Sequence, residues 1–533
     1  MPTLKALLSP LPEAEIIGGD GDIQVTQLFY DSREVTAGSA FICVPLDGDL
    51  YEEFNDEKRI RMITIALDAI KRGAGVIVAE DKNILSNLPD SVTKVFVPDA
   101  RKAIALMSAE FYGHPSRKMV LIGVTGTNGK TTTVNLTAQI LRHAGFKSVG
   151  VIGTLGVTTE NASDSIDIGN ARDSTTPRSL DIQKILFGFL EVGVEAVVME
   201  VSSHGLALQR VVGCAFDAAV FTNFTPDHLD FHKSLEEYLA AKTLFFTDIA
   251  NYSERFKRFA AIINTDDEHG RKLVDGVIKG AGYDYITYSI EEDSNIKAEN
   301  INVSTRSLEF CVQKYDGYDA VPFKTPLVGR FNIYNCLASI SVSRHLKIPP
   351  GKLQESLGSA KAPTGRMEFI DEGQSFTVIV DFAHSPDALG KILTALKESA
   401  VGRLICVFGC SGFKDPDRSK RISMGSIAAE LADFIVITSD NPRVEDPRSI
   451  AENILEGVRD QGKESNARIK IDRGEAIKYA LEVAEDGDTV VFAGKGHEKY
   501  QLLKDQKMVF DERGIVRETL RELLRTRGQL LEM

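Results

Sequence analysis

A glycine-rich turn, GTNGKTT, joins the apolar run VLIGVT to a stretch whose apolar residues recur at helical spacing. Gly126 and Gly129 allow the backbone to turn tightly and to present N–H groups to an anion. Lys130 supplies a point charge for phosphates, and the Thr131 hydroxyl is an oxygen ligand suited to Mg²⁺. Val124 departs from the strict phosphate-loop pattern, which has glycine at that position. A purely structural corner is the alternative, but the coincidence of strand, glycines, Lys-Thr and helix favours nucleotide binding.

Acidic and histidine side chains follow two later strand-like runs. Glu200 ends the run VVME, where its carboxylate could face the glycine-rich turn, and TNFTPDHLDFH carries His228 after another apolar run. Phosphate-bound Mg²⁺ needs further oxygen or nitrogen ligands, although this hard cation seldom takes histidine. Glu200 is therefore a candidate metal ligand, whereas His228 taken alone is more typical of a loop histidine.

Lys242 lies in the helical stretch SLEEYLAAKTLFF, four residues after Tyr238. The usual outcome for such a lysine is a stem packed on apolar surface with its ammonium in water. The functional alternative is a desolvated, neutral amine that is able to react with CO₂.

The segment DNPRVEDP begins at Asp440, directly after the apolar run FIVIT. It is typical of a turn at Asn441 with Arg443 paired to Glu445 or Asp446, and such an exposed pair contributes only about 0–1 kcal/mol. The turn ends a strand, however, and ligands of open α/β sheets bind where strands end. There a guanidinium can grip a carboxylate bidentately, while a neighbouring carboxylate takes an ammonium.

Short β-branched runs alternate with amphipathic helical stretches along the chain, as is typical of parallel sheets with crossover helices. Two segments with the composition of linkers, FYGHPSRK and KAPTGRME, divide the chain into three parts. In the last part, four strand-like runs end in aspartate or glycine: TVIVDFA, RLICVFG, FIVITSD and DTVVFAGKG. Ligands of open α/β sheets bind where strands end, so these four endings are candidate ligand positions.

The 533 residues carry 62 basic and 76 acidic side chains, a formal net charge of -14. This balance argues against a general surface for nucleic acid or anionic membranes. The six cysteines suggest no disulfide framework, and no stretch approaches the ~18 apolar residues of a membrane span. We therefore expect a cytoplasmic α/β protein that binds no nucleic acid and has no membrane span.

Several motifs resemble, in order and spacing, those of the Mur ligases, the ATP-dependent amide-forming enzymes of peptidoglycan precursor synthesis. They are TGTNGKTT, TTP, EVSSHGL, NFTPDHLDFH, YLAAK, GRFNIYN, DFAHSPD, DNPR and GKGHE. The resemblance covers nearly the whole chain and implies an α/β fold of three domains. These would be an N-terminal UDP-muramoyl-binding domain (1–116), a central P-loop-type ATPase domain with a mainly parallel sheet (117–362) and a C-terminal Rossmann-like domain that binds the amino acid (363–533).

The resemblance also implies roles for individual residues. ATP would be bound by Gly126, Thr127, Asn128, Gly129, Lys130, Thr131, Thr132, Asn332, Arg366 and Asp381. The UDP-muramoyl dipeptide would be held by Ser32, Arg33, Thr175, Thr176, Ser202 and Arg210. Mg²⁺ would be placed by Thr131, Glu200, His228 and a carbamylated Lys242, the last three being catalytic together with Lys130. Diaminopimelate would contact Asp440, Asn441, Arg443, Gly494 and Glu498.

By the same resemblance, the reaction adds meso-diaminopimelate to UDP-N-acetylmuramoyl-L-alanyl-D-glutamate. The substrate carboxylate would attack the γ-phosphate of ATP, and the amine would then attack the resulting acyl phosphate. Mg²⁺, Lys130 and the helix N-terminus would neutralise the phosphate charge. Diaminopimelate is expected rather than lysine because family members that add it resemble this chain in having arginine at position 443. We expect a monomer that serves cell-wall biogenesis and division.

Two segments depart from the family's pattern. After VFGC the chain reads SGFKDPDRSKR, with Phe413 in place of the usual aspartate. The residue that holds the amino-acid carboxylate there would be either Lys414 or Arg418. The segment EEFNDEKRIRMITIA (52–66) is longer than usual, and we expect it to be a surface insertion.

Other classes of protein make different predictions. A folylpolyglutamate synthetase would share the turn and the lysine but should lack DSREV and DNPR. A P-loop switch or motor would hydrolyse ATP to move a partner and would leave the strand-end motifs without a role. A nucleotide-binding module without activity would leave Glu200 and His228 without a task.

Overall fold

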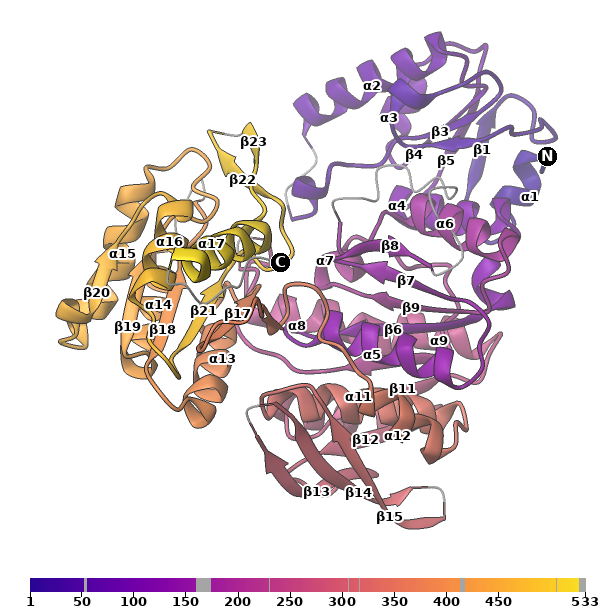
Figure 1. The fold of residues 1–533 in the computed structure, drawn as a ribbon. Helices are drawn as coiled ribbons and strands as arrows, with labels where there is room; N and C mark the ends of the chain where they lie inside the picture. Colours follow the sequence, from indigo (N-terminus) through magenta and orange to yellow (C-terminus); the bar gives the residue numbers. More distant parts are fainter. Residues whose placement is uncertain are drawn as a thin grey trace. The chain divides into compact units, whose positions relative to one another are not determined.

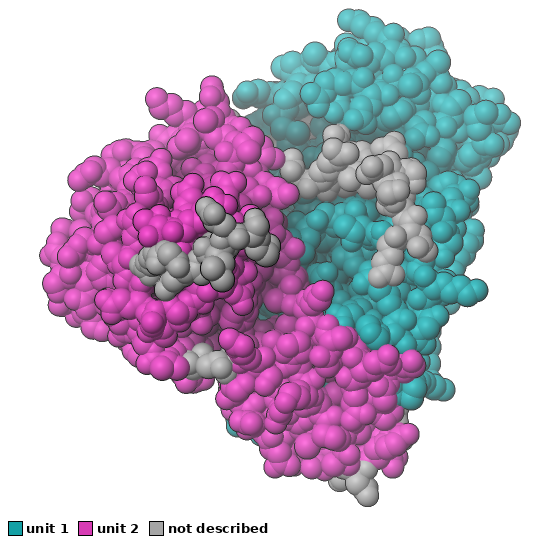
Figure 2. All heavy atoms as spheres, in the orientation of Figure 1, with its two compact units in different colours: residues 1–296, 338–349 teal, residues 297–337, 350–533 magenta. Residues whose placement is uncertain are grey.

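Parallel strands linked by crossover helices recur along the chain in the computed structural model, as the alternation of runs predicts (Figure 1). The structure describes residues 1–51, 55–159, 174–229, 231–304, 306–315, 317–412, 418–504 and 506–526. The chain forms two compact units, of which unit 1 comprises 1–296 and 338–349 and unit 2 comprises 297–337 and 350–533 (Figure 2). This division cuts the expected central range 117–362, so the three domain boundaries stay a prediction.

The first sheet of unit 1 has the strand order β1-β5-β4-β3-β2, in which only β1 is antiparallel to its neighbour. Val76 and Val78 of β4 pack with α1 and α4, whereas Ile77 and Ala79 point to the opposite face, toward α2 and α3. The elements are α1 (Leu4–Leu8), β1 (Glu15–Gly18), β2 (Leu28–Phe29), β3 (Ala40–Ile42), α2 (Asp56–Lys71), β4 (Val76–Ala79), α3 (Lys82–Ser86), β5 (Thr93–Phe96) and α4 (Ala100–Phe111).

Helix α2 corrects the expectation of a surface insertion over 52–66. From Asp56 onward this segment is an amphipathic helix, and Met62 and Ala66 are buried in the core beneath it. Asn55 caps the helix by accepting a hydrogen bond from the Lys58 amide at 3.0 Å. The charged first turn hides the apolar spacing, which starts only in the second turn. Residues 52–54 lie outside the described residues.

The second sheet of unit 1 has the strand order β12-β11-β10-β6-β9-β7-β8 and is parallel apart from the β7–β8 hairpin. Helices α6, α8, α9 and α10 cover one face, and α5 packs against β6, β7 and β9. In register, Val124 of β6 pairs with Glu200 of β9, and Thr125 pairs with Phe221 of β10. The carboxyl ends of these three strands therefore lie side by side.

The elements around this second sheet follow the order that the sequence predicts. They are β6 (Val120–Thr125), α5 (Lys130–His143), β7 (Val149–Gly153), β8 (Gly156–Thr158), α6 (Ser179–Glu191), β9 (Ala196–Glu200), α7 (Ser203–Ala207), β10 (Ala218–Phe221), α8 (Leu235–Thr243), α9 (Asp248–Glu254), β11 (Ala260–Asn264), α10 (Glu268–Gly276) and β12 (Asp284–Ser289).

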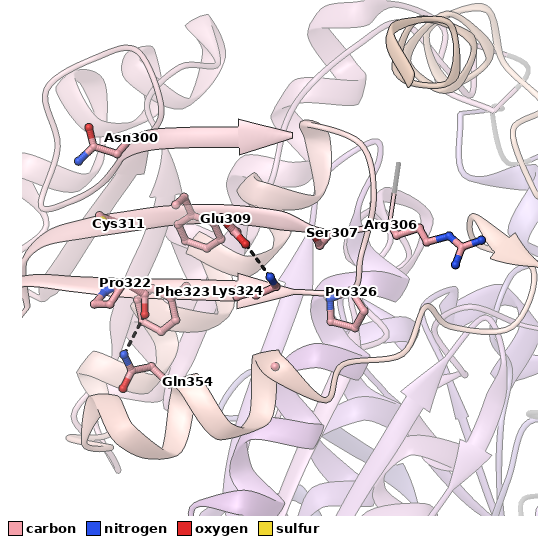
Figure 3. A pocket seen from close by; sticks show the side chains of 12 residues that line it. Asn300, Arg306, Ser307, Glu309, Cys311, Pro322, Phe323, Lys324, Pro326 and Gln354 are labelled. Carbon is pink, nitrogen blue, oxygen red and sulfur yellow. Dashed lines mark hydrogen bonds and ion pairs between the residues drawn. The ribbon is translucent and has the colours of Figure 1, made fainter. Parts of the chain in front are cut away.

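Unit 2 starts with the antiparallel strands β13 (Ile296–Val303), β14 (Leu308–Tyr315) and β15 (Tyr318–Thr325), followed by α11 (Phe331–His345), whose second half belongs to unit 1, and α12 (Pro350–Gly358). A pocket lies on these strands, where Lys324 pairs with Glu309 at 2.7 Å and Gln354 of α12 donates to the Pro322 carbonyl at 2.8 Å (Figure 3). None of the described residues that the sequence selects for a substrate lines this pocket. Concavity alone therefore does not locate the site.

The remaining sheet of unit 2 has the order β16-β17-β21-β18-β19-β20 and is parallel except for β16. Helices α13, α14 and α15 cover one face, and α16 and α17 cover the other. The four strand-like runs of the last part are β17, β18, β19 and β21, so this prediction is confirmed. The elements are β16 (Glu368–Phe369), β17 (Thr377–Asp381), α13 (Pro386–Ser399), β18 (Leu404–Phe408), α14 (Arg418–Leu431), β19 (Phe434–Ile437), α15 (Pro447–Asp460), β20 (Ala467–Ile469), α16 (Arg473–Val483), β21 (Thr489–Ala493), β22 (Tyr500–Leu503), β23 (Gln506–Val509) and α17 (Glu512–Thr526).

Within the described part of the chain, no helix combines the length and the apolar character that crossing a bilayer requires.

Candidate active site

The glycine-rich turn leaves β6 and enters α5 within a few residues. Gly126 has a φ of 142° and Gly129 a φ of 87°, which are backbone conformations that side chains disfavour. A Cβ at position 126 would also meet Thr222 Oγ1 at 1.9 Å. The turn therefore requires glycine at these two positions. It leads into the N-terminus of α5, whose first backbone N–H groups can bind an anion.

Polar residues at the end of β10 hold this turn, and the sequence does not single them out. Asn223 Oδ1 accepts the Asn128 amide at 2.9 Å, and its carbonyl accepts the Thr127 amide at 2.9 Å. Thr222 Oγ1 donates to the Asn128 carbonyl at 2.7 Å, and Tyr238 Oη lies 3.0 Å from Thr127 Oγ1. The available signal was a polar Thr-Asn pair directly after an apolar strand.

Lys130 folds back over the turn that precedes it. Its ammonium donates to the carbonyls of Gly126 at 2.9 Å and Thr127 at 2.8 Å. A phosphate oxygen forms a stronger, charge-assisted bond than a neutral carbonyl does. A phosphate bound at the turn would therefore replace these carbonyls as the hydrogen-bond partner of the Lys130 ammonium.

Glu200 ends β9 beside the turn and is only 2% exposed. Its Oε1 accepts hydrogen bonds from Thr131 Oγ1 at 3.0 Å and from the Thr154 amide at 2.9 Å, while Thr154 Oγ1 donates to Oε2 at 3.1 Å. A Cβ on Gly153 would lie 2.5 Å from Oε1. Gly153 therefore leaves the space that this carboxylate occupies, and Thr154 is a supporting residue that the sequence did not reveal.

Gly153→Ala should displace the Glu200 carboxylate without straining the backbone, because φ of Gly153 is not positive. We expect kcat for ATP turnover to fall by about 10²-fold, the usual result of a catalytic group moved by about 1 Å. Steady-state kinetics and the unfolding temperature should be measured together. Gly276→Ala at the end of α10 is the matched control, because a Cβ there meets nothing within 4 Å. Equal kcat values for the two variants would contradict the assignment.

His228 and Lys242 both lie against the ring of Tyr238. The Nζ of Lys242 is 4.4 Å from the ring centroid, and the centroid of the His228 imidazole is 5.9 Å from it. Lys242 is 2% exposed, and burial, with the charge of Lys130, holds its pKa well below the usual range. Burial also lowers the pKa of His228. Lys242 is therefore not a lysine that reaches water but a buried amine biased toward its neutral form.

The residues predicted to hold Mg²⁺ form two pairs: Thr131 with Glu200, and His228 with Lys242. Among the described residues, no three His, Cys, Asp or Glu side chains gather closely enough to hold a metal by themselves. The donor set nevertheless fits Mg²⁺, which binds through one or two carboxylates and takes its other ligands from phosphates and water. Glu200 and Thr131 supply hard oxygens, and a carbamate on Lys242 would supply another.

A second polar cluster adjoins Glu200. Thr176 Oγ1 donates to the Glu200 carbonyl at 2.9 Å and lies 3.0 Å from Ser202 Oγ. Arg210 donates to the Thr176 carbonyl at 2.7 Å. The structure thus brings Thr176, Ser202 and Arg210 together, and Thr175 Oγ1 lies 3.2 Å from Thr154 Oγ1. Their role on the muramoyl-peptide side stays a prediction.

Three arginines surround the carboxylate of Asp47 in the same unit. The closest contacts are 2.8 Å to Arg210, 3.5 Å to Arg178 and 3.6 Å to Arg101. The surplus of positive charge suits an anion such as a diphosphate. Sequence reasoning missed Asp47 and Arg101, which lie in segments without a motif, and Arg178, which directly follows the TTP motif. Together with Arg210 they line a pocket with Tyr30, Val44, Ile104, Ser179 and Leu208.

The two residues predicted for the uridine side have local partners. Ser32 Oγ donates to Asp68 Oδ2 at 2.9 Å. Arg33 pairs with Asp31 at 2.6 Å, and its side chain is 81% exposed, so this pair contributes little to stability. Ser32 and Arg33 come two and three positions after Tyr30, which lines the arginine pocket. They are therefore close in sequence to the arginine pocket. Among the described residues, neither forms a hydrogen bond with Thr176, Ser202 or Arg210.

In unit 2, the residues predicted on the nucleotide side make local contacts. Asn332 is buried and donates to the Val328 carbonyl at 2.7 Å. Both carboxylate oxygens of Asp381 accept backbone amides, at 2.7 and 2.6 Å. The guanidinium of Arg366 lies 4.6 Å from the Phe382 ring centroid. Asp381 therefore shapes the turn after β17, next to the arginine.

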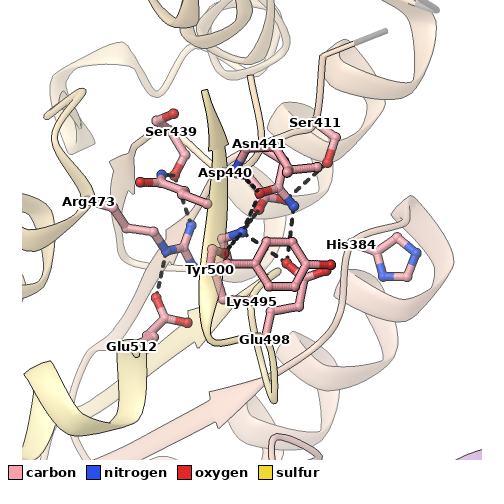
Figure 4. Close-up of polar contacts among 12 residues, drawn as sticks. His384, Ser411, Ser439, Asp440, Asn441, Arg473, Lys495, Glu498, Tyr500 and Glu512 are labelled. Carbon is pink, nitrogen blue, oxygen red and sulfur yellow. Dashed lines mark hydrogen bonds and ion pairs between the residues drawn. The ribbon is translucent and has the colours of Figure 1, made fainter. Parts of the chain in front are cut away.

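The residues predicted for the amino acid come from two loops that meet in unit 2 (Figure 4). Asp440 and Asn441 follow β19, whereas Gly494 and Glu498 follow β21. Asn441 Nδ2 donates to Glu498 Oε2 at 3.1 Å, and a Cβ on Gly494, whose φ is 111°, would lie 3.5 Å from Asp440 Oδ2. The loops that follow β19 and β21 are thus in direct contact.

Arg443 is exposed and has a φ of 52°, in the left-handed region. Its amide donates to the Leu502 carbonyl at 2.9 Å, which fixes the turn against β22. If this segment were only a structural turn, Arg443 would be expected to pair with Glu445 or Asp446. Glu445 accepts hydrogen bonds from Arg421 at 2.7 and 3.0 Å, and Asp446 caps α15. Both carboxylates thus have other structural tasks.

The segment that departs from the family's pattern after VFGC is described only in part. Arg418 begins α14. Phe413 and Lys414 lie outside the described residues, so the choice between Lys414 and Arg418 stays a prediction.

A fully buried ion pair supports both loops. Arg473 and Glu512 are each 0% exposed and lie 2.6 Å apart. Arg473 also donates to the carbonyls of Ser439 at 3.2 Å and Ala493 at 2.9 Å. These carbonyls directly precede Asp440 and Gly494, so α17 is joined to the amino-acid loops through one guanidinium.

Known proteins resemble this chain over nearly its whole length. Residues 124–343 match the Mur ligase middle domain, and residues 365–496 match the family described as Mur ligase, glutamate ligase domain. The chain is 40% identical to the UDP-N-acetylmuramoyl-L-alanyl-D-glutamate--2,6-diaminopimelate ligase of Clostridium botulinum, over 94% of this chain and 96% of the relative. The protein of that name from Geobacillus thermodenitrificans is 41% identical, over 97% and 99%.

A solved structure of a protein of the same name is 28% identical, covers 98% of this chain and 99% of its own, and superposes with a TM-score of 0.67. The likeness therefore extends across both units and agrees with the α/β architecture. With about 40% identity to curated relatives from end to end, the chain belongs to the Mur ligase family.

Proposed function

We propose that this chain is an ATP-dependent ligase that adds meso-diaminopimelate to UDP-N-acetylmuramoyl-L-alanyl-D-glutamate, with release of ADP and phosphate. The observation that carries the proposal is the meeting of the Asp440–Arg443 turn with the Gly494–Glu498 loop. This meeting brings the carboxylate of Asp440, three residues before Arg443, and that of Glu498 to the same buried lysine. The names of the relatives support the same substrates.

In the first step, a substrate carboxylate oxygen forms a bond to the γ-phosphorus of ATP, and the bond to the β-phosphate oxygen breaks. The chain's part is to position and to neutralise charge. The amides at the start of α5 and the ammonium of Lys130 would bind the phosphates, and Arg210 with its neighbours would hold the anionic substrate. Mg²⁺, when bound, would neutralise phosphate charge; Thr131, Glu200, His228 and Lys242 would hold it.

In the second step, the amine of diaminopimelate attacks the acyl carbonyl, phosphate leaves, and the nitrogen loses a proton. The loops at Asp440 and Gly494 would fix the distal end of the amino acid, so that its reacting amine is positioned by contacts remote from the reaction. Exclusion of water would protect the acyl phosphate from hydrolysis.

Carbamylation of Lys242 is part of the proposal. Nζ forms a bond to the carbon of CO₂ and loses a proton, which converts a cation into an anion. Burial favours this because it biases the amine toward the neutral, nucleophilic form. We further propose a cytoplasmic monomer with the three domain boundaries given above, since ATP and UDP-linked precursors are metabolites of the cytoplasm.

Phosphate release measured with ATP, the UDP-dipeptide and either diaminopimelate or lysine tests the function. We expect release only when both co-substrates are present, and a preference for diaminopimelate of about tenfold or more. A preference for lysine would contradict the substrate assignment. Release from ATP alone would indicate a nucleotide-hydrolysing switch instead of a ligase.

Arg443→Ala should raise the KM for diaminopimelate by more than about tenfold, the cost of losing a charge-assisted bond to its distal carboxylate. The KM for ATP should change little, because Arg443 belongs to the amino-acid loops. Arg448→Ala, which removes another exposed arginine from the start of α15, is the control. An unchanged KM for diaminopimelate in Arg443→Ala would refute its role as the substrate selector.

A further inference from the structure

Lys495, in the loop after β21, is completely buried between the two amino-acid loops (Figure 4). Its ammonium donates to Asn441 Oδ1 at 2.6 Å, to Glu498 Oε2 at 2.9 Å and to the Tyr500 carbonyl at 2.9 Å. Asp440 Oδ1 lies 3.2 Å away. One cation therefore contacts three of the residues assigned to diaminopimelate.

These contacts fix the orientation of the Asn441 amide and of the Glu498 carboxylate. Asn441 Oδ1 accepts from Lys495 and from the Leu502 amide at 3.0 Å, so its Nδ2 is directed at Glu498 Oε2. Oε2 of Glu498 thereby receives two donors. Among the described residues, no donor forms a hydrogen bond with Oε1, which is the oxygen left for the ammonium of a ligand.

The charges of the cluster match one kind of ligand. The carboxylates of Asp440 and Glu498 carry two negative charges, and the Lys495 ammonium between them cancels one. Arg443, in the same turn as Asp440, carries a second positive charge. The distal centre of diaminopimelate is a zwitterion, with one ammonium and one carboxylate, whereas the side chain of lysine ends in an ammonium alone. A neutral cluster suits the zwitterion, and an excess negative charge would suit lysine.

We propose that Lys495 is a positioning residue of the diaminopimelate site, which orients Asp440, Asn441 and Glu498 and sets the charge of the cluster. The inference rests on the proposed function and names a determinant of its amino-acid specificity. The task is distinct from that of a stabilising ion pair at the surface, because the lysine contacts both ligand loops and no part of it is exposed.

The test compares the wild type with Lys495→Met, which keeps the shape of the side chain, and Lys495→Gln, which keeps one donor. Lys507→Met is the matched control, because it removes an exposed ammonium that lies 4.1 Å from the same Tyr500 ring. The KM values for diaminopimelate, lysine, ATP and the UDP-dipeptide are measured, together with the unfolding temperature.

In both Lys495 variants, we expect the KM for diaminopimelate to rise by about tenfold or more, because the charge-assisted bonds that orient Asn441 and Glu498 are lost. The KM for ATP should stay within about twofold, and the preference for diaminopimelate over lysine should fall by about fivefold or more. The Lys507→Met control should match the wild type in all four KM values.

A loss of kcat or of active protein without a change in the KM for diaminopimelate would overturn the proposal, since it would leave Lys495 a purely structural task. Failure of both variants to fold would overturn it for the same reason. A wild-type protein without diaminopimelate-dependent phosphate release would instead contradict the proposed function itself, and this inference with it.

Discussion

Lys130→Ala is expected to lower kcat for amide formation by about 10³-fold or more. In the structure the Lys130 ammonium donates hydrogen bonds to the carbonyls of Gly126 and Thr127, and a γ-phosphate can replace these acceptors. Charge on the transferring phosphoryl group is redistributed in the transition state, so the loss should fall on kcat more than on the KM for diaminopimelate. Steady-state phosphate release measures kcat and the KM for diaminopimelate. Calorimetric titration with ADP measures whether the variant still binds the nucleotide.

Lys147→Ala is the control for this variant, because Lys147 is exposed just beyond the opposite end of α5. The unfolding temperature of Lys130→Ala should stay close to that of the wild type, since Lys130 is only half-buried and its loss leaves two neutral carbonyls, not a charge, without this donor. A variant that binds ADP and retains kcat within about tenfold of the wild type would show that Lys130 is not the phosphate-neutralising residue.

Lys242→Ala should lower kcat by about 10²–10³-fold, because it removes the anion that a carbamate would place beside the metal. Short carboxylates such as acetate should restore part of the activity, since the truncated side chain leaves a space in which a carboxylate can replace the carbamate. Mass spectrometry after alkylation of the wild-type protein should detect the trapped CO₂ adduct on Lys242.

Two comparisons make this expectation specific. Lys272→Ala removes an exposed lysine paired with Glu268 on α10, and it should neither lose activity nor respond to acetate. Lys130→Ala should lose activity without being rescued, because its missing charge is positive. Acetate that restores Lys130→Ala as well as Lys242→Ala, or that restores neither, would argue against a carbamate.

The sequence predicts well those parts of the site that lie in one segment. Apolar runs and helical spacing locate β6, β9 and β10, and also β17, β18, β19 and β21 of the six-stranded sheet. The polar residues that follow these strands are the candidate ligands. Glu200 and Asp440 were found in this way because each one ends a strand-like run. The pairing of Thr131 with Glu200 follows from the parallel register of β6 and β9.

Contacts between distant segments were not predictable in the same way. Asp47 pairs with Arg101, Arg178 and Arg210, which come from three other segments of the chain. The spacing of residues within one segment cannot predict such pairs. Lys495 stands inside the motif GKGHE, but its burial and its four oxygen neighbours exist only when β19, β21 and β22 are assembled. Helix α2 was misread because its first turn is charged, although its later turns have the spacing of a core helix.

The buried pair of Arg473 and Glu512 has a consequence for the order in which the chain matures. During synthesis Arg473 is made before Glu512. Until α17 packs against the sheet, the guanidinium of Arg473 therefore lacks its Glu512 partner. A buried charge without its partner costs about 3–5 kcal/mol. We therefore expect the carbonyls of Ser439 and Ala493, which Arg473 holds, to reach their final geometry only after α17 has packed. Although α17 contributes none of the residues predicted for the amino acid, the geometry of their loops would depend on it.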